Sequence, residues 1–328
     1  MKKTIDMKYN ELENLIDSLL KKEGLPDNIE YKSNEIVYSR RSKFLILTKA
    51  LIKLIEAEFF YNTYIRKRLK FLKKNKEIFN SLKKTRCIKA LRTYLHLCKI
   101  GLSDLMVQLG GSFDNKLFAN FTIATMLYDA SFDVKTFRKY IKYFDAFIMN
   151  NEKIEEIDEY MVLFKESVDY LRNTLGKQKF DDFMDYVKIE NVSQLMSIYQ
   201  LSDKKVSEKN LFKITFSKGG ISALALTYLM VPKLNAKEKK AIYELGAVMQ
   251  LVDDISDIEE DIKSGIQTLP NLKLLNFKEL KQMYQGTVNN LIEKCNIDPK
   301  KANSTLDMLC WFADTWIEKR YASLIETK

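Results

Sequence analysis

The chain has 328 residues, of which 46% are hydrophobic, and it contains only 10 glycines and 4 prolines. Enough apolar residues are present for a substantial core, and the scarcity of helix-breaking residues, with abundant Leu, Lys, Glu, Met and Ala, predicts helices almost throughout. A single histidine argues against Ser-His-Asp catalysis and His-rich zinc chemistry, and the formal net charge of +10 raises the question of a polyanionic partner.

The beginning of the chain and its apolar runs indicate neither export nor membrane insertion. Met1, Lys2 and Lys3 are not followed by the apolar segment that a secretory signal requires. The longest uncharged apolar run, Gly219 to Pro232, is too short to cross a bilayer and is expected to form a buried core helix. We therefore expect a cytoplasmic protein that is not an integral membrane protein.

In chain order, residues 1–33 are expected to form an N-terminal strap over the core. Helical periodicity then predicts helices near 34–60, 62–80, 84–109, 116–149, 153–175, 178–200, 207–231, 236–263, 277–295 and 299–326. A capping-box pattern at Asn235–Glu238 and a stop at Gly265 support the boundaries of the helix at 236–263. No segment alternates like a strand, so we expect one all-α domain spanning residues 1–328.

Cysteine and histidine are expected to serve the core. His96 lies in the apolar segment TYLHLCKI, which favours a core histidine over a catalytic one. The cysteine spacings match no zinc pattern, and a chain of this length does not need disulfides. We expect four reduced core cysteines, Cys87, Cys98, Cys295 and Cys310.

A strongly basic stretch runs from Arg66 to Arg92 and holds twelve Lys and Arg residues against one acid, Glu77. One interpretation is a footprint for nucleic acid or a membrane surface. The other is a solvated pair of helices, since the apolar residues between the charges keep helical spacing. The second is favoured, so we expect no nucleic-acid partner. Whether the chain forms a homodimer stays open.

The first candidate site lies in the segment FTIATMLYDASFDVKTF, residues 121–137. Asp129 and Asp133 are four residues apart and share one face of the predicted helix. That face continues backwards through largely uncharged residues, including Phe118. The pair therefore stands at the end of an apolar helix face.

A denser group of carboxylates follows the almost wholly apolar run Leu245–Val252, with six acidic residues from Asp253 to Asp261. Asp253, Asp257 and Asp261 are spaced four apart and share one face of the predicted helix. Like charges repel and need a cation nearby, and rows of carboxylate oxygens suit Mg²⁺. The alternative is a frayed, solvated helix end. The second pair on residues 121–137 favours the metal site, since two such helices facing each other would form a dry pocket with a metal-binding mouth.

These two segments resemble the aspartate motifs of class I isoprenoid (terpene) synthases. The segment DDISDIEEDIKSGIQTLP, residues 253–270, is similar to the second motif of squalene and phytoene synthases, and its carboxylate spacing is similar to that of the second motif of terpene cyclases. Asp253 and Asp257 stand where the cyclases carry Asn and Ser or Thr. The segment Asp129-Ala-Ser-Phe-Asp133 resembles the family's DDxxD or DxxxD motif. The resemblance implies a helical bundle around a central apolar cavity.

Two further segments fit this resemblance. Arg320–Tyr321 resembles the pair by which many terpene cyclases hold diphosphate, although a salt-bridged terminal helix is the alternative. Lys218-Gly219-Gly220 resembles the broken helix near the family's diphosphate sensor, which would aim Lys218 at the substrate. The chain lacks a Gly-Gly-Lys-Arg-like element and the further signatures of squalene and phytoene synthases, which favours cyclisation over condensation.

The resemblance implies that three Mg²⁺ ions clamp a prenyl diphosphate, farnesyl or geranylgeranyl, whose carbocation then cyclises in a water-free cavity. The implied metal ligands are Asp129, Asp133, Asp253, Asp257 and Asp261. The implied catalytic residues are Asp129, Asp253, Arg320 and Tyr321. The implied substrate-binding residues are Lys218, Gly220, Lys263, Arg320, Tyr321, Phe121, Met249 and Trp311. Further candidates for the cavity wall are Phe118, Met126, Tyr228 and Phe312.

Two alternatives stay open. One is a prenyl transferase, similar to squalene and phytoene synthases, that condenses two prenyl diphosphates. The other is a non-enzymatic basic helical protein that binds nucleic acid or a membrane surface through residues 66–92.

Overall fold

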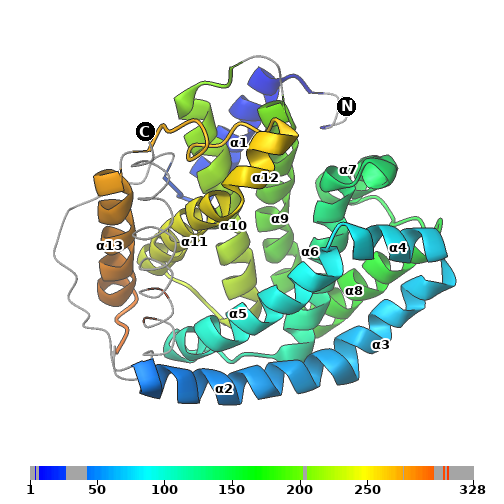
Figure 1. Cartoon of the computed structure of the whole chain (residues 1–328), viewed down its shortest axis with the longest axis horizontal. Coiled ribbons are helices and arrows are strands. Elements are labelled where there is room, and N and C mark those ends of the chain that lie inside the picture. Colours follow the sequence, from blue (N-terminus) through cyan, green and yellow to red (C-terminus); the bar gives the residue numbers. More distant parts are fainter. Residues whose placement is uncertain are drawn as a thin grey trace.

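The structure is a computed structural model that describes residues 4, 7–26, 43–201, 205–275, 277–298, 306 and 309, and for 43–50 and 277 the backbone alone. Within these ranges every regular element is a helix, which confirms the expected all-α class (Figure 1). The helices are α1 (Tyr9–Lys22), α2 (Lys43–Phe60), α3 (Arg66–Leu69), α4 (Lys76–Lys84), α5 (Cys87–Gln108), α6 (Asn115–Asp133), α7 (Ile141–Asn150), α8 (Glu159–Leu175), α9 (Lys177–Ser197), α10 (Glu208–Met230), α11 (Ala236–Ser256), α12 (Ile258–Ser264) and α13 (Phe277–Lys294).

The expected N-terminal strap takes the form of an amphipathic helix, α1, packed against α9. Leu12, Ile16 and Leu20 repeat every four residues and are all buried. The polar side of α1 is tied to α10, because Lys213 Nζ lies 2.7 Å from Asp17 Oδ1. Of the helix predicted at 299–326, only residues 306 and 309 lie within the described part of the chain.

Two of the long predicted helices are interrupted beside their aspartates. The helix predicted at 116–149 ends at Asp133, because Val134 takes an extended conformation before a 3₁₀ turn at Lys135–Tyr140 and α7. The helix predicted at 236–263 is broken at Asp257, which separates α11 from α12. At this break Ser256 Oγ donates a hydrogen bond of 2.9 Å to Asp257 Oδ1, and such local side-chain bonding competes with helix continuation.

The helices predicted at 34–60 and 62–80 are divided differently in the structure. From α2 the chain passes through a π turn, Tyr61–Ile65, into α3 and then a 3₁₀ turn, Lys70–Lys74. The next helix, α4, begins after Asn75, whose Oδ1 accepts a hydrogen bond of 3.2 Å from the Ile78 backbone N–H. The short turns therefore lie where continuous helix was expected.

At the centre, α10 packs between α9 and α11 (Figure 1). The helix predicted at 207–231 is confirmed, because α10 is α-helical from Glu208 to Met230, and the broken helix that the resemblance implied at Gly219–Gly220 is absent. The glycines instead allow close packing: a Cβ on Gly246 would lie 2.3 Å from the Gly219 carbonyl oxygen, and a Cβ on Gly220 would lie 2.5 Å from the Tyr243 ring. Only residues without side chains let the α10 and α11 backbones approach this closely.

The structure also bears on the expectations for membrane spans, cysteines and the single histidine. Among the described helices, none is both long and apolar enough to cross a membrane. Cys98 and Cys295 are buried free thiols, Cys87 is half-buried, and Cys310 lies outside the described residues. His96 lies where α5 meets α2, with Nε2 3.0 Å from Glu58 Oε2.

The close crossing of α10 and α11 can be tested with Gly246→Ala. The added methyl group would clash with backbone atoms of α10, and shifting a backbone costs more energy than shifting a side chain. We therefore expect the free energy of unfolding, measured by urea titration, to fall by about 1–3 kcal/mol. Gly24→Ala is the control: Gly24 has φ +68° but nothing within 4 Å of an added Cβ. It should lose only the ~1 kcal/mol that a left-handed conformation costs a non-glycine residue. An unchanged stability of Gly246→Ala would contradict the close crossing.

Candidate functional site

The carboxylates predicted to form a site come from two separate places, the end of α6 and the region where α11 meets α12. Asp129 and Asp133 occupy the last turn of α6, and Asp253 the last turn of α11. Asp129 lies close enough to Asp253 for their charges to interact. The fold therefore brings together two acidic segments that are more than a hundred residues apart in sequence.

Lys218 of α10 lies among these acids. Burial by itself would lower the pKa of Lys218, but the neighbouring carboxylates outweigh burial and raise it. These carboxylates come from three helices and are, in order of effect, those of Asp129, Asp133, Glu190 and Asp254. Lys218 is therefore a permanent cation at neutral pH that holds together acids from α6, α9 and α11.

The acids themselves are poorly compensated. The pKa of Asp129 is raised to about 7: desolvation is the largest cause, Lys218 opposes the rise, and the neighbouring Asp133 and Asp253 contribute to it. Desolvation likewise raises the pKa of Asp254 to about 7 and that of Asp261 to about 6. The cluster thus carries more carboxylates than its own cation can neutralise, which favours binding of a further cation or of protons.

A polar cleft opens beside Lys218. It is lined by residues from the 3₁₀ turn Ile198–Leu201 after α9, from α10, from α11–α12 and from the segment that follows: Gln200, Ile214, Thr215, Lys218, Gln250, Asp253, Asp254, Asp257, Asp261, Ile266 and Thr268. Gln250 Nε2 donates to both neighbouring acids, at 3.3 Å to Asp253 Oδ2 and 3.0 Å to Asp254 Oδ1. Thr215 Oγ1 lies 3.3 Å from the other oxygen of Asp254. Neutral donors therefore hold both oxygens of the Asp254 carboxylate. Asp254 was not predicted from the sequence, because only acids spaced four residues apart, Asp253, Asp257 and Asp261, were selected there as metal ligands.

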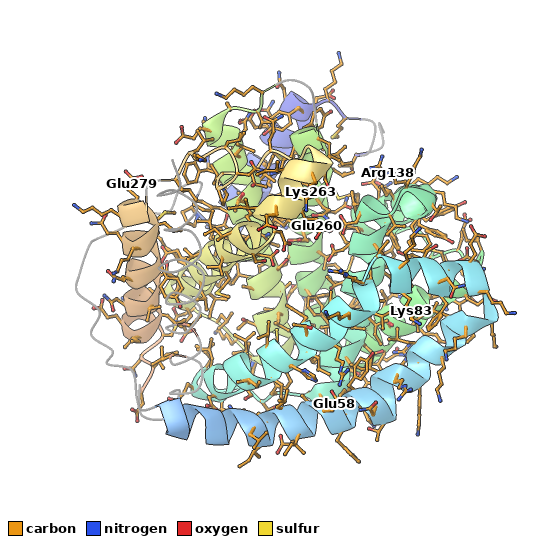
Figure 2. The ribbon with its side chains drawn as sticks, viewed as in Figure 1. Glu58, Lys83, Arg138, Glu260, Lys263 and Glu279 are labelled. Carbon is orange, nitrogen blue, oxygen red and sulfur yellow. The ribbon has the colours of Figure 1, made fainter. Side chains whose placement is uncertain are left out.

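The break at Asp257 changes the predicted stripe. Asp253, Asp257 and Asp261 were expected on one face of a continuous helix, but they lie on either side of a break. All three nevertheless line the same cleft. Figure 2 labels Glu260 and Lys263 on α12 and Arg138 beyond the end of α6, toward the same end of the molecule. Lys263 is exposed on α12 and does not line the cleft.

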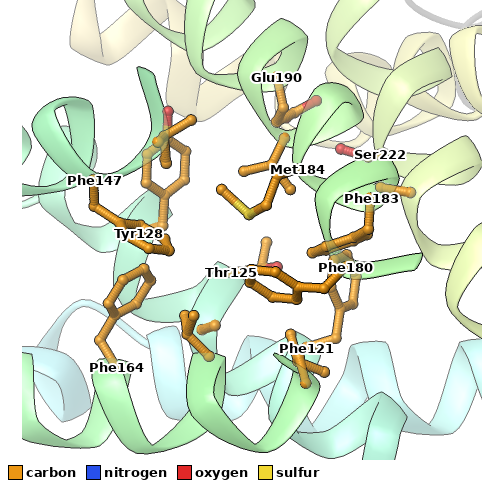
Figure 3. A pocket seen from close by; sticks show the side chains of 16 residues that line it. Phe121, Thr125, Tyr128, Phe147, Phe164, Phe180, Phe183, Met184, Glu190 and Ser222 are labelled. Carbon is orange, nitrogen blue, oxygen red and sulfur yellow. The ribbon is translucent and has the colours of Figure 1, made fainter. Parts of the chain in front are cut away.

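An apolar cavity of about 80 Å³ lies between α6, α7, α8, α9 and α10 (Figure 3). Its wall is aromatic and aliphatic, and it includes Phe121, Tyr128, Phe147, Phe164, Phe180, Phe183 and Met184. Phe121, one of the predicted substrate-binding residues, lies in this wall. The wall residues from α8 and α9 were not predicted, because a buried aromatic helix face is also what ordinary core packing requires.

Among the described residues, Glu190 is the one carboxylate that lines this apolar cavity (Figure 3). The pKa of Glu190 is raised to about 8: desolvation is the largest cause and Asp129 also raises it, while Lys218 and a hydrogen bond with Ser222 oppose the rise. Its Oε2 atom is buried without a hydrogen-bond partner among the described residues. Glu190 therefore connects the aromatic cavity to the charged cluster. In the sequence, the one indication of this role is that Glu190 is an acid on the helix face that also carries Phe183 and Val187.

Tyr94 of α5 borders the same charged space and was also missed. Its side chain is 39% exposed, yet desolvation is the largest cause that raises its pKa, with Cys98, Asp129 and Glu190 as further causes. The Tyr94 ring stacks on Phe118, with 5.9 Å between the ring centroids.

The remaining predicted residues lie elsewhere. Gly220 packs on the Tyr243 ring, and Met249 packs against the core without lining the cleft or the cavity. Met126 is buried in the core, and Tyr228 donates a hydrogen bond of 2.9 Å to Asp182 outside the cavity wall. Trp311, Phe312, Arg320 and Tyr321 lie outside the described residues.

Comparison with known proteins adds no family to this geometry. No family model, no curated protein and no solved structure matches the chain.

Lys218→Met tests the electrostatic role of the central lysine. Loss of the cation leaves its carboxylates uncompensated, so the free energy of unfolding should fall by roughly 1–3 kcal/mol. The loss should be greater at about pH 8 than at about pH 5, because protonation of the acids relieves their repulsion at the lower pH. Lys209→Met, at an exposed position of the same helix, is the matched control and should change stability by less than about 0.5 kcal/mol. An equal loss at both pH values would contradict the role of Lys218 as counter-charge.

Glu190→Gln tests the burial of a protonated carboxyl in the cavity wall. The pKa of Glu190 is raised in the folded state to about 8, so the folded chain keeps a proton that the unfolded chain releases. Stability of the wild type should therefore fall as pH rises from about 5 to 8, by at most about 1.4 kcal/mol per pH unit from this group. Chemical denaturation of Glu190→Gln should show a shallower decline, and exposed Glu155→Gln should follow the wild type. Parallel profiles for all three proteins would contradict this assignment.

Proposed function

We propose that the chain is a class I terpene synthase, which ionises a prenyl diphosphate with Mg²⁺ and cyclises the resulting carbocation. One observation carries the proposal: the acids of α6 and of α11–α12 surround Lys218 next to an aromatic cavity. A prenyl diphosphate has these two halves, an anionic head and an apolar tail. The geometry therefore offers one compartment for each half.

The donor set suits Mg²⁺. Asp129 and Asp133 would hold ions from the α6 side, and Asp253, Asp257 and Asp261 from the α11–α12 side. In the part of the chain that the structure describes, no three carboxylate, histidine or cysteine side chains are grouped so as to hold a metal by themselves. Mg²⁺ usually takes only one or two carboxylates and completes its shell with water and substrate phosphate, so this spacing is compatible with it. When bound, Mg²⁺ would neutralise charge on the leaving diphosphate.

The protein groups have separable tasks. The Lys218 ammonium can donate charge-assisted hydrogen bonds to a diphosphate oxygen, while Gln250 and Thr215 orient Asp254. The apolar cavity excludes water from a reactive cation, and aromatic faces stabilise such a cation by on the order of 1–2 kcal/mol each. Substrate would contact the side chains of the cavity wall, of which Met184 is the most adaptable.

The proposal is tested by diphosphate release from geranyl, farnesyl and geranylgeranyl diphosphate, with and without Mg²⁺, and by mass spectrometry of the extracts. We expect Mg²⁺-dependent turnover of one chain length to a cyclic hydrocarbon or alcohol. The double variant Asp253→Asn, Asp257→Asn should lose at least about 100-fold in kcat/KM, because it removes oxygens that would hold metal on the α11–α12 side.

The matched control is Asp181→Asn, an exposed aspartate on α9, which should retain wild-type kcat/KM. A product with more carbons than its substrate would assign the chain to prenyl transfer instead. The proposal is wrong if no prenyl diphosphate is turned over, or if the double variant is as active as the wild type.

A further inference from the structure

An exposed edge of the molecule combines apolar and basic side chains in one line. The helical run from α2 to the 3₁₀ turn Lys70–Lys74 follows the lower edge of the view in Figure 1. Its inward side is made of apolar residues at helical spacing that are all buried, Ala57, Tyr61, Ile65, Leu69 and Leu72. Its outward side carries exposed side chains that the core does not use.

The first half of the outward side is apolar. Leu51, Ile52, Ile55 and Phe59 are 55%, 58%, 60% and 70% exposed. They recur at one, four and eight residues from Leu51, so they form a stripe along one side of α2. Isolated exposed apolar residues are ordinary, but four aligned on one helix indicate an interaction surface.

The second half of the outward side is basic. Five exposed cations follow the stripe along the same run, Arg66, Lys67, Lys70, Lys73 and Lys74. We call the four apolar and five basic residues together the α2–α3 ridge. The acids of α2 do not cancel its charge: Arg92 Nη2 lies 2.6 Å from Glu58 Oε1, and Lys99 Nζ lies 3.6 Å from Glu56 Oε2.

We infer that the α2–α3 ridge attaches the protein to the surface of an anionic lipid bilayer. Aliphatic and aromatic side chains insert at the boundary between headgroups and acyl chains, while Lys and Arg pair with acidic headgroups. Charge complementarity selects this partner, since the ridge and the whole chain, with net charge +10, are basic.

Two other partners fit less well. A nucleic acid would use the cations but leave the apolar half in water, because backbone recognition depends on charge. A second copy of the chain would bring like charges together, and four side chains supply far less than the ~800 Å² per partner of a stable interface. The bilayer is the partner that uses both halves of the ridge.

The test is co-sedimentation of the full chain with vesicles of phosphatidylcholine alone and of phosphatidylcholine mixed with phosphatidylserine. We expect binding to the anionic vesicles that weakens as salt is raised, and little binding to the neutral ones. Ile55→Ser with Phe59→Ser should weaken the partition coefficient by about tenfold or more, and so should Lys70→Glu with Lys73→Glu. Both pairs are exposed, and circular dichroism melts should show folded variants.

Matched controls place the same changes elsewhere. Val107→Ser removes an apolar side chain that is 59% exposed on α5, and Lys209→Glu with Lys237→Glu reverses two exposed lysines at the starts of α10 and α11. Both controls should bind vesicles like the wild type.

The inference is overturned if the wild type does not bind anionic vesicles or if ridge and control variants bind alike. It is also overturned if the serine variant converts a dimer to a monomer in light scattering, or if only the lysines matter and nucleic acid competes. None of these readouts depends on prenyl diphosphate turnover, so this inference and the proposed enzyme activity succeed or fail separately.

Discussion

Lys218 is surrounded by carboxylates from α6, α9 and α11, and the arrangement of the candidate site depends on that one ammonium. Without it, acids from helices distant in sequence would repel one another across a space largely removed from water. With it, they remain close but still under-neutralised, as the raised pKa values of Asp129 and Asp254 indicate. The proposed chemistry depends on a divalent cation that would complete this neutralisation.

The position of Lys218 depends in turn on how closely α10 and α11 pack. Gly219 and Gly246 meet backbone to backbone, and this contact lies one residue after Lys218 and seven before Asp253. The glycines that suggested a flexible, broken helix thus perform the opposite role, because they let two regular helices hold the lysine and the acids at a defined separation. Rigid supporting elements are what a site needs if charged groups are to keep their geometry.

Charge is divided between the interior and the surface of the molecule. The cleft gathers acids, whereas the α2–α3 ridge is basic and contributes to the net charge of +10. An acidic cleft in a basic protein is compatible with the proposed reaction, because a cation would bind inside while the outer field would attract an anionic substrate. The apolar half of the ridge adds a feature that charge steering alone would not require.

The all-α class was determined by the sequence itself, because helical periodicity and the scarcity of glycine and proline act locally. The same holds for the aspartate pairs: Asp129 and Asp133 are four apart on one helix, and the acids after Val252 follow an apolar run whatever surrounds them. The local sequence pattern was sufficient to predict a feature wherever the residues that determine it lie within one or two helical turns of each other.

Only the tertiary structure decided which distant groups meet. Glu190 became a candidate through its position between the cavity and Lys218, and Asp254 through the donors Gln250 and Thr215. The break at Asp257 and the role of Gly219 also escaped prediction, because both depend on hydrogen bonds and close contacts whose partners a helical pattern does not specify. The exposure of Phe59 could not be predicted either. Periodicity places an apolar residue on a helix face, but it does not say whether another element covers that face.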